Sequence, residues 1–411
     1  MHRRTTFKAL CFMFFSLSHT TQAASFTISN ANIIDVNSGK IQKKQNILIQ
    51  DDKIASIESA QQGQAQGDNV VDVKGQFVMP GFSDMHTHPY FTNDAKQFPT
   101  TDNSTFKEYL ASGVTFIRDC GSNFDAVKSA QSRIAAKQLL GPRIASVGPM
   151  LDGKDTGFQT VEKIGSAQEA NSVVSDLTSQ GADYIKVHLK LTADAFGAIA
   201  TACQQNNISF GGHVPDQINA RTAVQKGMRI FEHMSRIESD NDVALLRGNE
   251  FTATCTLVQG PTPQRMKTCA GLQKGQTRVL SGTDSPAGQG LCPGRSLHRE
   301  LELMNQAGLS PLEVLQSTTI RAAEAVNMEN EIGTVEVGKF ADLVILTKNP
   351  LEDIKNTRNV AGVVANGTYL SAQDIQKLRS AANVAKTLPF ACGDSKAQKL
   401  AARTAVTCCS A

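Results

Sequence analysis

Residues 81–88, GFSDMHTH, decide the fold prediction because a short apolar β-type run leads directly into two histidines. Alternate residues of a strand point to the same side, so His86 and His88 can reach one metal ion from a strand end. A His-x-His pair alone is a weak signal, since ordinary polar residues give the same pattern. The rest of the chain has to decide between the two interpretations.

From residue 81 to about residue 328, short apolar strands alternate with helical segments, as βα units do. Eight strands over roughly 250 residues match the size of a (β/α)₈ TIM barrel. The candidate strands are residues 81–86, 114–119, 143–147, 184–187, 209–213, 229–233, 251–257 and 278–281. We therefore predict an α/β fold in which residues 81–328 form the barrel.

Both ends of the chain carry short β-type runs separated by turn residues instead. We predict that residues 24–80 and 329–380 together form one small β-sandwich domain. Residues 381–411 are rich in alanine and lysine and are predicted to be a C-terminal tail.

Residues 1–23 have the composition of a cleavable signal peptide, with a basic start, a short apolar run and small residues at Thr21 and Ala23. The apolar run is too short for a stable transmembrane anchor. We predict cleavage after Ala23 and a periplasmic or secreted protein. An uncleaved N-terminal anchor is the alternative interpretation.

The formal net charge is +3, and residues 1–23 carry three basic side chains and no acidic one, so the remaining chain is neutral. A neutral chain gives no electrostatic reason to expect nucleic acid or an anionic membrane as a partner. A small-molecule substrate is the expected partner, and a homo-oligomer stays open.

Export would permit disulfides, and eight cysteines follow residue 23 without a Cys-x-x-Cys pair. Two pairings are candidates: Cys269 with Cys292, and Cys392 with Cys408 or Cys409. Cys120 and Cys255 lie in apolar runs, which predicts ordinary core residues.

Four further candidate ligands lie at or near the ends of other candidate strands, namely Lys186, His213, His233 and Asp284. The carboxyl ends of barrel strands build the active site of this architecture. The spacings that follow His88 are 98, 27, 20 and 51 residues. At about 30 residues per βα unit, they assign the set to strands 1, 4, 5, 6 and 8. An ammonium group cannot bind a cation, so Lys186 fits only if its charge is removed, and otherwise it is a buried or snorkelling lysine.

Together these motifs resemble the amidohydrolase superfamily from about residue 26 to residue 370. The similarity is closest to the imidazolonepropionase-like and prolidase-like (Xaa-Pro dipeptidase) branch. It is carried by residues 80–88, the strand around Lys186, His213, His233 and residues 281–285, and also by residues 113–115, 141–143, 296–301 and 333–343.

The resemblance implies that Lys186 reacts with CO₂ to give an N6-carboxylated lysine, an anionic ligand that bridges two divalent metal ions. Zn²⁺ is the expected ion, and Mn²⁺, Co²⁺ or Ni²⁺ are alternatives. The resemblance also implies that His86, His88 and Asp284 hold the first metal and that His213 and His233 hold the second. Metal-bridged hydroxide would then attack the substrate, while Asp284 acts as catalytic base and acid.

Three residues beside the predicted ligands are candidate substrate contacts. His188 shares a strand face with Lys186, and a metal-ligand or purely structural role is equally open for it. Tyr90 and Arg236 follow metal-bearing strands and could meet a substrate oxyanion or carboxylate, with a surface-loop role as the alternative.

We therefore predict an exported binuclear metal-dependent hydrolase that cleaves amide (C–N, non-ester) bonds, with a dipeptide or an N-acyl amino acid as substrate. One alternative is a cyclic amide or lactone hydrolase or an imidazolonepropionase-like enzyme, including a mononuclear deaminase-like form. The other alternative is a non-catalytic metal-binding protein on the same scaffold.

Overall fold

The computed structural model describes residues 25–60, 69–287 and 290–384, and side-chain burial up to residue 380. The predicted signal peptide and residues 385–411 of the predicted tail lie outside this range. Among the described residues, none of the helices has both the length and the apolar composition needed to cross a bilayer.

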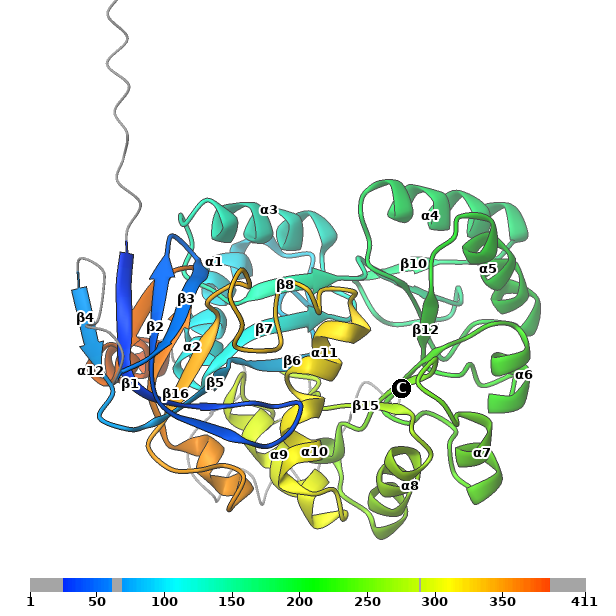
Figure 1. Cartoon of the computed structure of the whole chain (residues 1–411). Helices are drawn as coiled ribbons and strands as arrows, with labels where there is room; N and C mark the ends of the chain where they lie inside the picture. The colour runs from blue at the N-terminus through cyan, green and yellow to red at the C-terminus, as the bar shows by residue number, and fades with distance from the viewer. Residues whose placement is uncertain (1–24, 61–68, 288–289, 385–411) are drawn as a thin grey trace, which may run out of the picture.

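Eight parallel strands form the central part of the molecule, and each overlaps one predicted strand (Figure 1). They are β6 (Phe82–Thr87), β7 (Val114–Asp119), β8 (Arg143–Ser146), β11 (Ile185–Val187), β12 (Phe210–Gly212), β13 (Ile230–Glu232), β14 (Thr252–Thr254) and β15 (Arg278–Leu280). They belong to a three-stranded sheet, β6-β7-β8, and a seven-stranded sheet, β10-β9-β11-β12-β13-β14-β15. The strands β9 (Met150–Asp152) and β10 (Val161–Lys163) were not predicted.

Backbone hydrogen bonds connect the two sheets on both sides. The amide of Asp183 donates to Ser146 O at 2.9 Å between β8 and β11, and the amide of Met85 donates to Ser281 O at 3.0 Å between β15 and β6. The result is a TIM-barrel-like α/β fold, as predicted from the alternation of strands and helices.

Helices cover the outside of these strands (Figure 1). They include α3 (Phe124–Ala135), α4 (Ala167–Ser179), α5 (Ala193–Gln205), α6 (Ala220–Gln225), α7 (Asp240–Leu245), α8 (Pro263–Lys274), α9 (Arg295–Gln306), α10 (Pro311–Ser317) and α11 (Ile320–Ala325). Several start at a side chain that accepts a backbone N–H of the first turn, such as Ser166 for α4 and Thr192 for α5. Their buried faces share one hydrophobic core with the strands, to which Ile199, Phe231 and Leu301 belong.

The two ends of the chain meet in one mixed sheet with the order β18-β17-β16-β5-β1-β2-β3, and β4 pairs with β1. Its strands are β1 (Ser25–Ile34), β2 (Ile41–Gln50), β3 (Lys53–Ser59), β4 (Asn69–Asp72), β5 (Phe77–Pro80), β16 (Leu343–Leu346), β17 (Val360–Ala365) and β18 (Thr368–Ser371). The antiparallel pairing of β5 with β16 joins the ends, with Met79 opposite Val344. A contribution from both ends was predicted, but a sandwich of two facing sheets is not confirmed.

The described chain contains a disulfide between Cys255 and Cys269, with 6.1 Å between the Cα atoms. The predicted pairing of Cys269 with Cys292 is therefore wrong. Cys255 is buried in the hydrophobic core, as predicted, but it is disulfide-bonded and so is not an ordinary core residue. The end of β14 lies against α8, a proximity that the spacing of cysteines does not reveal. Cys120 is a buried free thiol, as predicted. Cys392, Cys408 and Cys409 lie outside the described residues.

Candidate metal centre

The six predicted ligands converge at the carboxyl ends of five strands. His86 lies in β6 and Lys186 in β11, whereas His88, His213 and His233 follow directly or closely after their strands and Asp284 comes from the turn after β15. All six side chains are buried, with exposed fractions of 8% or less. Segments nearly two hundred residues apart thus share one interior site.

Short distances connect the first group of side chains. Nε2 of His86 lies 3.3 Å from Nε2 of His88 and 3.4 Å from Nζ of Lys186. Oδ1 of Asp284 lies 3.1 Å from Nε2 of His88 and 3.5 Å from Nε2 of His86. Four polar atoms from three separate strands therefore face one point.

The second group adjoins the first. The ring centroid of His233 lies 4.3 Å from that of His86 and 4.7 Å from that of His213. The ring of His188 follows at 4.4 Å from His213. The two groups form one continuous cluster rather than two distant sites.

The backbone is unusual where two of these residues leave their strands. His233 has φ +60° and Asp284 has φ +66°, both in the left-handed region. This region costs a non-glycine residue about 1–2 kcal/mol. Such conformations persist where the surroundings fix them, and they gather at functional sites.

A hydrogen bond to Nδ1 orients four of the rings. His86 Nδ1 lies 2.6 Å from Glu232 Oε2, and His88 Nδ1 lies 3.0 Å from Gly121 O. His233 Nδ1 lies 2.8 Å from Thr256 Oγ1, and His188 Nδ1 lies 3.0 Å from Asp152 Oδ2. An anchored Nδ1 fixes the ring and leaves Nε2 to face the cluster, which is how metal-binding histidines are usually held.

The donor set fits divalent metal ions. The ligand atoms of His86, His233 and Asp284 all lie within 4.8 Å of one another. Within the described part of the chain, the buried Nε2 atoms of His188 and His233 have no hydrogen-bond partner. Burial, together with the neighbouring cations, holds the pKa of His213 and His233 well below the usual range, so both imidazoles are neutral. Neutral imidazoles with a carboxylate are typical ligands of Zn²⁺ and similar ions.

Glu232 is the most important residue of the site that was not predicted. Burial alone would raise its pKa, but the Arg118 guanidinium at 2.6 Å and His86 hold it well below its usual range. Glu232, Arg118 and Asp152 are charged residues inside or at the end of apolar strand sequences. This feature of the sequence could have identified them as residues of the site. Thr256 and Gln259, whose Nε2 donates to Asp284 Oδ2, gave no such signal.

The three candidate substrate contacts have different surroundings. His188 adjoins the cluster, as described. Arg236 is partly exposed, and its Nη2 lies 2.7 Å from Asp216 Oδ1. Tyr90 lies in the hydrophobic core, where its hydroxyl donates to Asp102 at 2.5 Å and its ring packs edge-on against Phe98 and Phe106. These contacts fit a packing role for Tyr90, because the hydroxyl is already engaged outside the cluster.

A cavity of about 600 Å³ opens beside His213 and His233. Its wall also contains Arg236, Gln259 and Arg265. This volume lies within the usual range of small-molecule sites. The cluster is therefore accessible from a space large enough for a small substrate.

Comparison with known proteins agrees with this geometry. Residues 77–370 match the model of the amidohydrolase family. A 5'-deoxyadenosine deaminase of Methanobrevibacter smithii is 23% identical over 363 residues, covering 74% of this chain and 80% of that protein. An imidazolonepropionase of Symbiobacterium thermophilum is 25% identical over 332 residues, covering 68% and 76%.

Two solved structures show the same fold. A putative prolidase from Bifidobacterium longum superimposes with a TM-score of 0.73 at 24% identity, covering 88% of this chain and 99% of that one. A Xaa-Pro dipeptidase with bound methionine gives a TM-score of 0.72 at 20% identity, covering 85% and 100%.

Proposed function

Because the chain belongs to the amidohydrolase family, we propose that this hydrolase of carbon–nitrogen bonds is an exported binuclear enzyme that cleaves the amide bond of a dipeptide or an N-acyl amino acid. The observation that carries the proposal is the convergence of four histidines, a lysine and an aspartate in one buried cluster beside a cavity. The prolidase-like fold supports the choice of substrate class.

The proposed ligands divide into two sets. His86, His88 and Asp284 would hold one metal ion, and His213 and His233 would hold the other, with Zn²⁺ as the proposed ion. Lys186 would join them in its N6-carboxylated form. The burial of Lys186 supports this assignment, because carboxylation would replace a buried amine, 3.4 Å from Nε2 of His86, with an anionic oxygen ligand. When bound, the metal ions would lower the pKa of water and polarise the scissile carbonyl.

Asp284 is the proposed proton carrier. Burial opposes its ionisation, but hydrogen bonds from His86 and His88 outweigh this effect and hold its pKa well below the usual range. The carboxylate is therefore in the basic form, and Gln259 fixes its other oxygen. Asp284 would take a proton from the attacking water and deliver it to the leaving amine.

The rim of the cavity supports an anionic substrate. Asp216 Oδ1 lies 2.7 Å from Arg236 Nη2, and Asp216 Oδ2 lies 3.5 Å from Lys190 Nζ. Glu238 and Arg265 also line this cavity, so three cations face two carboxylates and the charged side chains there sum to a net positive charge. We propose that Arg236 binds the free carboxylate of the substrate. His188 would accept an N–H of the substrate at its Nε2. Its Nδ1 faces Asp152 and burial lowers its pKa, so the ring is neutral and Nε2 is the acceptor.

The test is hydrolysis by the metal-loaded full chain of dipeptides and N-acyl amino acids, each compared with its C-terminal amide. We expect metal-dependent hydrolysis that Asp284→Asn abolishes. Arg236→Ala should raise KM for the free acids about tenfold or more and leave the amides unaffected, since it removes one charged contact. Arg221→Ala, at an exposed position on α6, is the matched control. Absence of metal-dependent hydrolysis across the panel would reject the proposal.

One alternative function has a specific observation in its favour, namely the similarity to an imidazolonepropionase. Cyclic amides and lactones therefore belong in the same panel. Preference for a cyclic substrate would select this alternative. One metal per chain, together with an active Lys186→Ala variant, would select a mononuclear enzyme.

Export is proposed from the composition of residues 1–23. The Cys255–Cys269 disulfide supports it, because disulfides persist in oxidising compartments. Expression in a bacterium with mass spectrometry of the periplasmic fraction tests it. A mature chain that begins at Ala24 is expected, and an intact N-terminus in the cytoplasm would contradict the proposal.

A further inference from the structure

The segment that follows β14 contacts both halves of the cluster. Thr256 Oγ1 lies 2.8 Å from Nδ1 of His233, and Gln259 donates to Oδ2 of Asp284. Thr256 thus supports a proposed ligand of one metal, and Gln259 supports a proposed ligand of the other. The conformation of this short segment therefore affects both metal sites at once.

Thr256 adopts a conformation that its residue type disfavours. It is completely buried and has φ +44° and ψ +44°, in the left-handed region. For a β-branched side chain this backbone is an outlier. An outlier of this kind persists only when the surrounding structure fixes it. Contacts between Thr256 and neighbouring residues must therefore stabilise its left-handed conformation.

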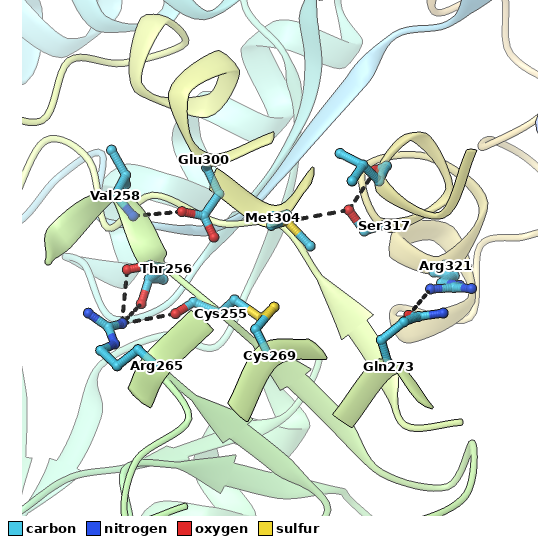
Figure 2. The surroundings of a disulfide bond; sticks show 11 residues. Cys255, Thr256, Val258, Arg265, Cys269, Gln273, Glu300, Met304, Ser317 and Arg321 are labelled. Atoms are coloured by element: carbon cyan, nitrogen blue, oxygen red, sulfur yellow. Dashed lines mark hydrogen bonds between the residues drawn. A yellow bond between two sulfur atoms is a disulfide. The ribbon is translucent and has the colours of Figure 1, made fainter. Parts of the chain in front are cut away.

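Two connections to α8 provide this restraint (Figure 2). Nη2 of Arg265 donates to Cys255 O at 2.9 Å, to Thr256 O at 2.9 Å and to Thr256 Oγ1 at 3.2 Å. Its Nη1 donates to Gly260 O at 3.1 Å. The Cys255–Cys269 disulfide ties the residue before Thr256 to the same helix. A planar guanidinium presents its N–H donors as a rigid fork, whereas a lysine offers a single ammonium on a flexible stem.

We propose that Arg265 and the Cys255–Cys269 disulfide are positioning elements of the hydrolytic site. They hold Thr256 in the left-handed conformation, which aims its hydroxyl at His233 and places Gln259 against Asp284. The inference rests on the proposed function of the cluster. It adds that the geometry of the site is set from outside the barrel strands, by a helix that supplies none of the proposed ligands.

The first test is Arg265→Gln in the full chain loaded with Zn²⁺ or Co²⁺. Metal content after dialysis against a chelator, the visible spectrum of the Co²⁺ form, kcat and KM are measured. We expect metal affinity and kcat to fall about 10–100-fold, the usual effect of losing an outer contact to a ligand, with KM changed less than twofold. A raised KM with unchanged metal content would instead make Arg265 a substrate contact and would overturn the inference.

A second variant separates positioning from general destabilisation. Thr256→Ser keeps the hydroxyl and removes the branched methyl group, so the left-handed conformation is less strained. In the Arg265→Gln background it should restore much of the metal affinity and kcat. A double variant no better than Arg265→Gln alone would overturn the inference. Arg278→Gln is the matched control, because this arginine on β15 pairs with Glu324 at 3.3 Å and should leave metal content and kcat unchanged.

The disulfide is tested by Cys255→Ser with Cys269→Ser. We expect weaker metal retention and a lower kcat. The combined effect with Arg265→Gln should be less than the product of the separate effects, because both act on Thr256. Fully multiplicative effects would show independent action and contradict the inference. Metal retention needs no substrate, so this test stays decisive even if the wild-type chain hydrolyses none of the proposed amides.

Discussion

Glu232 Oε2 lies 2.6 Å from Nδ1 of His86, and both side chains are completely buried. The other oxygen of Glu232 accepts from Arg118 at 2.6 Å and from Tyr184 at 3.2 Å. A buried ion pair thus orients the ring of the first histidine in the sequence motif, from a strand on the other side of the barrel.

Glu232→Gln is expected to weaken metal binding about 10–100-fold, because the carboxylate no longer orients His86. It should also destabilise the fold by about 3–5 kcal/mol, since Arg118 loses its buried counter-ion. Chelator competition and denaturant unfolding measure the two effects. Glu324→Gln breaks a partly exposed pair with Arg278 and serves as the control. Unchanged metal affinity in Glu232→Gln would disprove the orienting role.

Lys186→Met is expected to abolish the second metal site. Lys186 is completely buried and its Nζ lies 3.4 Å from His86 Nε2, so a thioether of similar length keeps the volume without the nitrogen. Native mass spectrometry should find a CO₂ adduct and two metals in the wild type, and neither adduct nor second metal in the variant. Lys226→Met, at an exposed position, should behave as the wild type. Two metals retained in Lys186→Met would rule out a bridging lysine.

Gly212→Ala should disturb β11, the strand that carries Lys186. Gly212 has φ +130°, and an added Cβ would lie 2.2 Å from Val187 O and 3.0 Å from Lys186 Cδ. We expect a loss of roughly 1–3 kcal/mol in unfolding free energy, together with weaker metal binding. Gly197→Ala is the control, because it lies in α5 with open space around it and should stabilise by about 0.5–1 kcal/mol. Urea titration with metal analysis gives both results, and a neutral Gly212→Ala would refute the packing argument.

His298 should make the fold sensitive to acid. Burial, with Arg358 and Arg379 adding to the effect, lowers its pKa to about 3, while the unfolded value is about 6.5. Between these values the unfolded chain binds a proton that the folded chain does not. Stability therefore falls as the pH is lowered through this window, by up to about 1.4 kcal/mol per pH unit.

The measurement is the unfolding free energy of wild type and His298→Gln across about pH 4 to 6. Because His298 packs edge-on against Phe82 at 5.6 Å, the variant will be less stable overall, and the slope rather than the absolute value decides. The slope of the unfolding free energy against pH should be smaller in His298→Gln, by an amount that corresponds to the uptake of up to one proton on unfolding. Identical slopes would contradict the assignment.

The positions of the proposed ligands were readable from the sequence for a simple reason. A polar residue that ends an apolar strand lies at the same face as every other residue in that situation, because all the strands are parallel. His213 and His233 could be placed beside His86 on that basis without any coordinates. The resemblance to the amidohydrolase superfamily rested on the same residues and is confirmed by the family match.

The cysteines and the outer contacts of the site could not be predicted in the same way. The pairing of Cys255 with Cys269 depends on α8 lying against the end of β14, whereas the sequence favoured Cys292 as the partner of Cys269. Tyr90 follows a strand that carries proposed metal ligands, as Arg236 does, yet its ring lies in the core and its hydroxyl reaches Asp102. Turn geometry decides such cases, and no periodicity describes it.

The sequence by itself determined the βα alternation, the strand on which each proposed ligand lies and the kind of chemistry that these side chains support. Those properties follow from local periodicity and residue type. Only the tertiary structure decided that Glu232 orients His86, that Arg265 and the disulfide restrain Thr256, and that the chain ends share a single sheet. Each of these depends on contacts between distant segments, whose geometry is set by packing rather than by any local pattern.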